Sequence, residues 1–480
     1  MSWTSICVHV LVCLFGIGSW IDINGVWVEL PVMVQYLPEG WSLGSYLVII
    51  IQLANIGPLV VTLVTVFMPS KMKESAAVYA ILIVGALACL LLAFLWQQTS
   101  LVSGVEHSVA LLVLQFFLAL VDCTSSVVFL PFMSVFKEQY MTTYFIGEGL
   151  SGLLPSLVAL VQGAGAVRCV RLENLDQNTS RTNSEWVNET AYSVYPEFLP
   201  PRFPVRTFFI FLFFMMVACC TAFIILNHHP FCRSEKVFRS ETKYEVVVEV
   251  KTNGVELEAY HKPAEDQNGI PFNPSEDVCT TGLMSVEGRG DPQDGHIMDD
   301  PLGCPIQDIQ LSRCMYFYYL LLTGWMNGMT NAVLPSLQTY SCIPYGLGPY
   351  HLAVIFASIS NPLACFVAVV LPTKSNSIIS TIALTGSLLS SYIITLAALS
   401  PVPFLKSDSS GGIIMIVSWV LTILSLSYAK VTIAAIFRIE GKKALLWCGA
   451  ATQIGSALGA IIMFVLINVS KVFQSAPMCS

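Results

Sequence analysis

Long apolar segments separated by short polar loops make up almost the whole chain. Eleven of these segments are long enough to cross a hydrocarbon layer of about 30 Å as helices, at about 1.5 Å per residue. Helix is the expected state because unpaired backbone groups find no water inside a bilayer. The predicted spans are Ile6–Val34, Leu43–Met68, Ala76–Trp96, Ser108–Phe136, Thr142–Gln162, Phe208–Leu226, Arg313–Leu337, His351–Leu371, Ser377–Leu399, Gly412–Phe437 and Ala444–Val469.

One long polar segment interrupts this series. Residues 227–312 are rich in Glu, Asp, Gly and Pro and contain too few hydrophobic residues to fold alone. We expect a disordered cytoplasmic loop, in which the valine-rich stretch 244–251 could form a strand. The predicted fold class is an all-α integral membrane protein of eleven transmembrane helices, six in residues 1–226 and five in 313–469, followed by an extracellular tail, 470–480. Two bundles of this kind are typical of transporters.

The composition agrees with a membrane protein and excludes several functions. Of the 480 residues, 55% are hydrophobic and 11% are charged, whereas a soluble domain carries about 25% charged residues. The net charge of −8 comes largely from the polar loop, and no basic patch predicts a nucleic-acid partner. The chain has no Walker loop, HExxH, GxSxG or dinucleotide-binding motif. We therefore expect a monomer that is not an enzyme and has no cofactor or metal site.

The orientation follows from two signals. The glycosylation sequons at Asn178 and Asn188 lie in the loop 163–205 and predict that this loop is extracellular. Counting spans then gives a cytoplasmic N-terminus and an extracellular C-terminus. The short loops assigned to the inside carry seven lysines and arginines, whereas those assigned to the outside carry almost only Lys406, as the positive-inside rule requires. Arginines within the sequon loop conflict mildly with this assignment, but long loops translocate largely regardless of charge.

Three cysteines would lie outside the membrane, where a disulfide can form. They are Cys169, Cys342 and Cys479. Three candidates allow no pairing to be assigned.

The first span carries an unusual concentration of polar and aromatic residues. A carboxylate at the centre of a bilayer costs at least about 2.5–3.5 kcal/mol, so its presence indicates a function. Helical periodicity places Trp20, Asn24, Trp27 and Pro31 on one face and Asp22, Gly25 and Glu29 on the opposite face. The first face could stack on and hydrogen-bond a flat polar ligand. Alternatively, the tryptophans belong to an interfacial belt and Glu29 caps a neighbouring backbone.

Other spans carry polar stripes of the same kind. Most single intramembrane polar residues hold helices together, with about 0.6–2 kcal/mol each, and Lys430 could simply extend to the membrane surface. Three carboxylates on different spans, Glu29, Asp122 and Glu148, are harder to explain in this way and are candidates for proton coupling. The remaining candidate site residues are Gln52, Asn55, Ser126, Phe129, Tyr144, Asn327, Asn331 and Gln338, of which the last three align at i, i+4 and i+11.

Several stretches together resemble the vertebrate riboflavin transporters, and most closely the acid-stimulated intestinal-type member. The resemblance extends over essentially every predicted span. It is carried by Gly25–Pro31 (GVWVELP), Leu37–Leu43 (LPEGWSL), Gln52–Pro58 (QLANIGP), Asp122–Ser126 (DCTSS), Gly147–Pro155 (GEGLSGLLP), Asn331–Ser336 (NAVLPS), Asn361–Ala364 (NPLA) and Ser427–Val431 (SYAKV).

This resemblance implies carrier-mediated, sodium-independent uptake of riboflavin (vitamin B2) across the plasma membrane, favoured by low outside pH. The implied architecture is similar to that of equilibrative nucleoside transporters and the major facilitator class. Relatives often carry a cysteine where this chain has Val402. Their disulfide to the C-terminal tail is therefore not expected for Cys479.

Riboflavin joins a flat three-ring system with an imide edge to a polyhydroxyl chain. A site for it needs an aromatic wall, amides for the ring edge, and hydroxyls or carboxylates for the ribityl arm. The candidates for the wall are Trp20, Trp27 and Phe129; those for the ring edge are Asn24, Asn327, Asn331 and Gln338; those for the arm are Glu29, Asp122 and Tyr144. A nucleoside or another heterocyclic vitamin would suit the same groups. A cell-surface receptor and a channel are the alternatives from other classes.

Overall fold

The structure is a computed structural model that describes residues 3–67, 74–173, 192–236, 245–248, 259–262, 311–373, 375–406, 408–440 and 442–475. The sequons at Asn178 and Asn188, the tail cysteine Cys479 and most of the predicted cytoplasmic loop lie outside these ranges. The chain divides into two compact units, one of Met1–Val237 with Gln310–Ser480 and one of Phe238–Ile309. The described part of the second unit is an antiparallel pair, β5 (Glu245–Val248) with β6 (Ala259–Lys262), and β5 lies in the valine-rich stretch.

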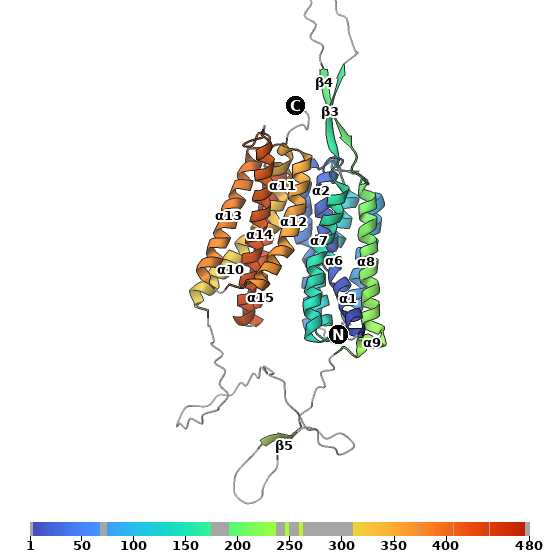
Figure 1. Cartoon of the computed structure of the whole chain (residues 1–480), viewed down its shortest axis with the longest axis vertical. Helices are drawn as coiled ribbons and strands as arrows, with labels where there is room; N and C mark the ends of the chain where they lie inside the picture. The colour runs from blue at the N-terminus through green and yellow to red at the C-terminus, as the bar shows by residue number, and fades with distance from the viewer. Residues whose placement is uncertain are drawn as a thin grey trace, which may run out of the picture. The chain divides into compact units, whose positions relative to one another are not determined.

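The first unit is built of helices, with two short hairpins at one end (Figure 1). In chain order its elements are α1 (Trp3–Ile17), α2 (Ile21–Met33), η1 (Gly40–Ser42), α3 (Leu43–Ala54), α4 (Ile56–Phe67), α5 (Glu74–Leu95), β1 (Ser100–Val102), β2 (Val105–His107), α6 (Val109–Met133), α7 (Glu138–Gln162), β3 (Ala166–Glu173), β4 (Tyr192–Leu199), α8 (Val205–His228), α9 (Pro230–Arg233), α10 (Arg313–Gly328), the π-helix η2 (Met329–Val333), α11 (Leu334–Cys342), η3 (Ile343–Tyr345), α12 (Leu347–Val370), α13 (Asn376–Ala398), α14 (Ser409–Glu440), α15 (Lys442–Phe464) and the π-helix η4 (Val465–Val469).

Most of the predicted spans are present as helices. Among the described residues, nine helices are long and apolar enough to cross a membrane, and α1 with α2, which meet at 54°, would form a tenth. The predicted span Arg313–Leu337 is also helical, as α10, η2 and α11, but it is not among these ten. The total of eleven spans and their six-plus-five division stay predictions.

Three breaks in the helices have local causes. Pro58 has no backbone N–H to donate to the carbonyl of Ala54, and α3 ends at Ala54. Pro335 likewise cannot bond the carbonyl of Asn331, and the π-helix η2 lies at this point. Between α1 and α2 the chain bends at Gly18–Trp20, where the Ser19 hydroxyl donates 2.7 Å to the carbonyl of Gly16.

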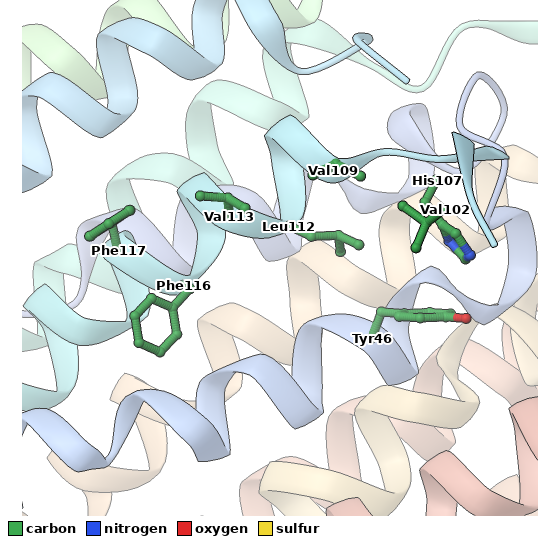
Figure 2. Close-up of a pocket in the computed structure, with 8 residues that line it drawn as sticks. All are labelled: Tyr46, Val102, His107, Val109, Leu112, Val113, Phe116 and Phe117. Atoms are coloured by element: carbon green, nitrogen blue, oxygen red, sulfur yellow. The ribbon is translucent and has the colours of Figure 1, made fainter. Parts of the chain in front are cut away.

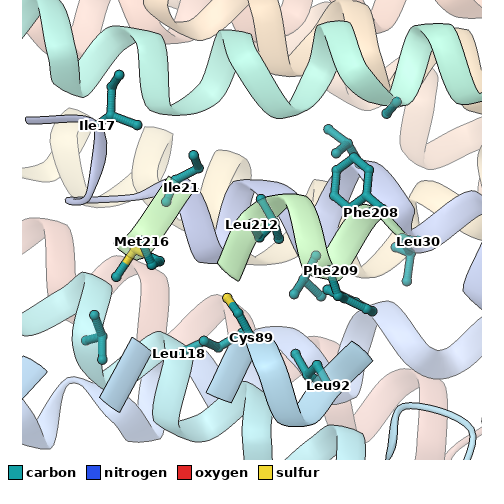
Figure 3. Close-up of a cluster of buried hydrophobic side chains, with 14 of the residues drawn as sticks. Ile17, Ile21, Leu30, Cys89, Leu92, Leu118, Phe208, Phe209, Leu212 and Met216 are labelled. Carbon is teal, nitrogen blue, oxygen red and sulfur yellow. The ribbon is translucent and has the colours of Figure 1, made fainter. Parts of the chain in front are cut away.

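Helices α1–α8 pack mainly on one another, and we call them the N-terminal group. Their core surrounds α8, whose side chains meet α2, α5 and α6 (Figure 3). A Cβ on Gly25 would collide with Leu212 of α8. Helices α1 and α7 approach so closely that a Cβ on Gly147 would meet the carbonyl oxygen of Cys13, and one on Gly16 would meet that of Tyr144.

Helices α10–α15 form the C-terminal group. Its core contains Tyr319, Met326, Leu426 and Phe437, which pack α10 against α14. Helices α10 and α15 are in backbone contact, because a Cβ on Gly455 would meet the carbonyl of Gly324.

The two groups meet near the end that bears β3 and β4 (Figure 1). The Asn468 amide donates 2.8 Å to the Ser45 hydroxyl, and the Trp41 and Tyr340 rings meet edge to face at 5.7 Å. A Cβ on Gly44 would lie 2.9 Å from the Pro335 carbonyl oxygen. The beginning of α3 therefore packs directly on α11 and on the end of the α15–η4 segment.

The first ten residues of the predicted cytoplasmic loop have a defined structure. The chain is ordered from 227 to 236, as the end of α8, α9 and an isolated bridge between Phe136 and Lys236. The Lys137 ammonium lies 2.8 Å from the Glu235 carboxylate, which also accepts a 3.0 Å bond from the Tyr140 hydroxyl. These contacts anchor the segment to the beginning of α7. These contacts join residues about 95 positions apart in the sequence, so local sequence patterns do not predict them.

Candidate functional site

The two predicted faces of α2 lie in different surroundings. Asp22, Gly25 and Glu29 are buried within the N-terminal group. Asn24 and Trp27 are partly buried. Trp27 packs against a small cluster of Val48, Ala332 and Ala460, whose members come from both groups. The face that we predicted to bind a ligand therefore lies at the junction between the groups.

Asp22 and Asp122 form a buried carboxyl cluster next to the bend between α1 and α2. Asp122 accepts a 2.9 Å bond from the backbone N–H of Ile23, and the Cys89 thiol donates 3.2 Å to Asp22. Both aspartates are 0% exposed. In the described ranges, one oxygen of each lacks a hydrogen-bond partner, and neither carboxyl has a cation within 4.0 Å. Such a cluster is suited to holding a proton, because a buried unpaired charge is costly.

Glu29 lies about two turns further along α2, and its polar neighbour is Gln162, the last residue of α7. Both Glu29 oxygens and the Gln162 side-chain oxygen lack partners within the described part of the chain. The Gln162 amide nitrogen instead donates 3.2 Å to the carbonyl of Phe203. A proton on Glu29 would satisfy two of these acceptors.

The third polar cluster is centred on the π-helix η2. The Asn331 amide nitrogen donates to the Asn327 side-chain oxygen at 3.3 Å and to the Ser456 hydroxyl at 3.1 Å. The Asn327 amide nitrogen donates to the Thr452 hydroxyl at 3.3 Å. The Lys430 ammonium of α14 donates to the Thr330 hydroxyl at 2.8 Å. Four helical segments thus share one hydrogen-bonded network, which we call the η2 network. π-Helical turns often occur at functional sites.

Helix α7 adds polar groups at the junction with α2 and α12. The Asn24 amide donates a long 3.5 Å bond to the Ser151 hydroxyl, and a Cβ on Gly152 would lie 3.6 Å from the same amide nitrogen. Glu148, one turn before Ser151, is partly buried. Cys365 of α12 lies close enough to both Glu148 and Lys430 for their charges to act on it. Glu148 of α7 and Lys430 of α14 are therefore both in the neighbourhood of Cys365.

Several candidate residues lie away from this junction. Phe129 and Tyr144 are 0% and 1% exposed, and both rings pack around Phe15 in the core of the N-terminal group. The predicted roles of Phe129 in the aromatic wall and of Tyr144 at the ribityl arm stay predictions, and in this structure both rings belong to the core. The Gln52 side-chain oxygen accepts a 3.3 Å bond from the Asn55 amide at the α3–α4 break. Trp20 packs against the cluster that contains Ala54 and Ala119. Ser126 is exposed.

The predicted alignment of Asn327, Asn331 and Gln338 holds only in part. Asn327 and Asn331 are hydrogen-bonded, but η2 adds one residue to the turn and shifts every position after it by about 100°. Gln338 is buried in α11. Sequence reasoning missed Thr330 and Thr452, which ordinary helical spacing does not distinguish from packing residues. Lys430 does not extend to the surface, since its ammonium bonds Thr330.

The structure also has a shallow apolar groove of about 520 Å³ beside α3 and α6 (Figure 2). Tyr46 and His107 lie at one end of it, and Phe116 and Phe117 at the other. None of the candidate site residues lines this groove. The predicted chamber between the helix groups is thus a separate feature, and it stays a prediction.

Cys342 is a buried free thiol. Cys342 therefore forms no disulfide within the described residues, and the pairing of Cys169 and Cys479 stays open.

Comparisons with known proteins agree with the sequence resemblance. A profile of solute carrier family 52, riboflavin transporter, matches residues 4–475. The chain is 44% identical over 474 residues to riboflavin transporter 2 of Salmo salar, covering 98% of both chains. It is also 44% identical over 483 residues to solute carrier family 52, riboflavin transporter, member 3-B of Danio rerio, covering 99% of both.

The fold is similar to that of a solved transporter. A bacterial homologue of the human lysosomal transporter Spinster, in an inward-facing and unoccupied conformation, aligns with a TM-score of 0.51 at 10% identity, covering 98% of this chain and 84% of that one. This likeness concerns the fold alone. The multi-pass helical architecture, the expectation of a transporter rather than an enzyme and the predicted family are thereby confirmed. The chain belongs to solute carrier family 52, the riboflavin transporters.

Proposed function

We propose that this multi-pass transporter takes up riboflavin across the plasma membrane by alternating access, with the flavin bound between the N-terminal and C-terminal groups. One observation supports this site most strongly. Trp27 of α2 packs against the cluster of Val48, Ala332 and Ala460, and Ala332 directly follows Asn331 of the η2 network. An aromatic ring is thereby placed beside amide and hydroxyl groups from the other group of helices. A flat heterocycle with a polar edge needs this combination.

The same arrangement selects among the predicted site residues. Asn24 and Trp27 from the N-terminal group, with Asn327 and Asn331 from the C-terminal group, are the proposed ring-binding residues. Glu148 is the proposed partner for the ribityl arm, because it lies one turn from Ser151, which contacts Asn24. The candidates buried elsewhere would act indirectly, by shaping α2 and α7.

Acid stimulation has a separate basis. Asp22, Asp122 and Glu29 are carboxyls without a cationic partner in the described part of the chain. Asp122 also bonds the first turn of α2, the helix that carries Asn24 and Trp27. Protonation of this cluster would change the position of α2 and so couple outside pH to binding.

Orientation and conformational state follow from the same proposal. With the N-terminus in the cytoplasm, the hairpin β3–β4 and the contacts between Trp41 and Tyr340 face outside. The protein, acting as a monomer, would then be closed to the outside. The opposite ends of the two groups would separate to release riboflavin into the cell.

The test is competition of labelled riboflavin uptake in cells that express the protein. We expect lumiflavin, which keeps the ring system, to compete, and uridine not to compete. Asn331→Ala should lower uptake about tenfold at normal surface level, through loss of two hydrogen bonds in the network and of one to the ring. Wild-type uptake in this variant would remove Asn331 from the site, and competition by uridine alone would favour a nucleoside carrier.

A further inference from the structure

Lys430 is the charged residue of the η2 network, and the proposed function assigns it no role. It lies more than two turns from the end of α14 and is partly buried. Its Nζ bonds the Thr330 hydroxyl at 2.8 Å, and no described carboxylate oxygen lies within 4.0 Å of it. A cation at this depth without a counter-charge is costly and marks a binding function.

Among the described residues, some hydrogen-bond donors and acceptors of Thr330, Asn331 and Lys430 have no partner. Thr330 has one hydroxyl proton, and its oxygen lies 3.0 Å from the carbonyl of Met326 and 3.1 Å from the side-chain oxygen of Asn331. It can donate to only one of them at a time. Both amide protons of Asn331 are taken by Asn327 and Ser456. Two N–H groups of Lys430 and acceptor capacity on the Asn331 oxygen therefore remain.

These unused groups lie next to each other, because Lys430 Nζ and the Asn331 oxygen contact the same Thr330 hydroxyl. Together they present a donor and an acceptor. A cyclic imide edge presents the complementary pair, a carbonyl acceptor beside an N–H donor. The flavin ring carries such an edge, whereas its dimethylbenzene end and its ribityl arm do not.

We propose that Lys430 is a substrate-binding residue that donates to a carbonyl of the imide edge of the flavin ring, while the Asn331 oxygen accepts from the adjacent ring N–H. This inference rests on the proposed function and names the ring atoms that the η2 network recognises. It makes the imide, rather than ring stacking alone, a determinant of specificity. A binding site built to hydrogen-bond an N–H discriminates strongly against analogues that lack it.

Glu148 offers the competing role for Lys430. Both residues lie in the neighbourhood of Cys365, so the two could instead pair when the groups move. An ion pair of that kind would govern turnover and leave equilibrium affinity for the flavin ring unchanged. Affinity and turnover therefore separate the two roles.

The experiment measures dissociation constants from flavin fluorescence with the purified full-length transporter. The ligands are riboflavin, lumiflavin and N3-methyl-lumiflavin. The variants are Lys430→Met, Lys430→Arg and Asn331→Ala, with Lys406→Met as the control, since Lys406 is an exposed loop lysine. Lys430→Met keeps the length of the side chain and removes a charge from the membrane interior, so folding should survive.

For riboflavin and for lumiflavin alike, Lys430→Met should weaken binding about tenfold or more, the loss of one charge-assisted hydrogen bond. Lys430→Arg should retain part of the wild-type affinity for both flavins, and Lys406→Met should bind them as tightly as wild type does. Wild type should bind N3-methyl-lumiflavin about tenfold more weakly than lumiflavin. Asn331→Ala should abolish that discrimination.

Other results overturn the proposal. Unchanged lumiflavin affinity in Lys430→Met, with or without slower uptake, removes the ring contact and favours a pairing role. Loss of affinity for riboflavin alone assigns Lys430 to the ribityl arm. If wild type transports riboflavin and only these contrasts fail, the Lys430 proposal alone falls. If wild type binds neither flavin, the proposed function falls with it.

Discussion

The Thr339 hydroxyl donates a 2.6 Å hydrogen bond to the backbone carbonyl of Trp41, and so joins α11 to η1. Asn468 and Ser45 make a second neutral bond nearby. Neutral bonds of this kind contribute about 0.5–1.5 kcal/mol each. A contact between the groups made of such bonds and of close packing at Gly44 can close tightly and still open during a transport cycle.

Locking this end should stop transport. The Ser45 hydroxyl oxygen and the Asn468 amide nitrogen are 2.8 Å apart. In Ser45→Cys/Asn468→Cys one sulfur takes the place of that oxygen and the other lies one bond short of that nitrogen, so a short thiol cross-linker should join α3 to η4. Alternating access then predicts that riboflavin uptake falls close to background after cross-linking and returns on reduction. The single variants provide the controls, treated with the same reagent. Full uptake by the cross-linked protein would show that this contact does not open.

Removing the charge of Asp122 should flatten the pH dependence of uptake. Asp122→Asn keeps an oxygen to accept the Ile23 N–H, so the bend between α1 and α2 should hold. We expect wild-type uptake to rise several-fold as outside pH falls from 7.4 to 5.5, because the protonated cluster favours binding. The variant should show the same uptake at both values. Glu106→Gln, on the exposed strand β2, is the matched control. An unchanged pH profile in Asp122→Asn would move proton coupling to Glu29 or Glu148.

The ion pair between α7 and the segment after α9 should stabilise the protein at neutral pH and lose this effect at acid pH. The Lys137 ammonium 2.8 Å away lowers the pKa of the Glu235 carboxyl below its ordinary value of 4.5. The stabilisation is therefore complete above that ordinary value and is lost as pH falls through the lowered one. Melting temperatures of wild type and Glu235→Gln should differ slightly at pH 7 and converge at acid pH. A difference that grows toward low pH would contradict this ion pair.

Contact between α1 and α7 should tolerate no added methyl group. A Cβ on Gly147 would meet the backbone oxygen of Cys13, which cannot move aside as a flexible side chain can. Gly147→Ala should therefore cost about 1–3 kcal/mol of stability and lower the melting temperature of the purified protein. Gly449→Ala is the control, because a Cβ there meets nothing within 4 Å. Equal melting temperatures for the two variants would mean that the helices are further apart.

Helical periodicity alone predicted the two faces of α2. Their spacing in the sequence sets the angle between Asp22 and Trp27 around the axis of α2. The hydrophobic helices that pack on α2 determine which of its two faces is buried. Periodicity did not predict the surroundings of Phe129 and Tyr144, because a polar stripe gives an angle around the helix and does not say which neighbouring helix it faces. Phe15 and its aromatic neighbours take both rings into the core.

The sequence also could not predict where the helices depart from regular α-helical geometry. The π-helix η2 follows from Pro335, but a proline can be accommodated by a kink, a break or a π-turn. The π-turn seen here moves Gln338 out of alignment with Asn327 and Asn331, and it places Thr330 beside Lys430. The bend between α1 and α2 is similar, since Gly18 and Ser19 permit it without requiring it.

Riboflavin accumulation in vesicles that contain purified protein tests the central claim most directly. With inside pH at 7.4 and outside pH at 5.5 or 7.4, we predict saturable uptake into wild-type vesicles that lumiflavin inhibits, and faster uptake at the acidic outside pH. Uptake no greater than in protein-free vesicles under both conditions would contradict a flavin carrier.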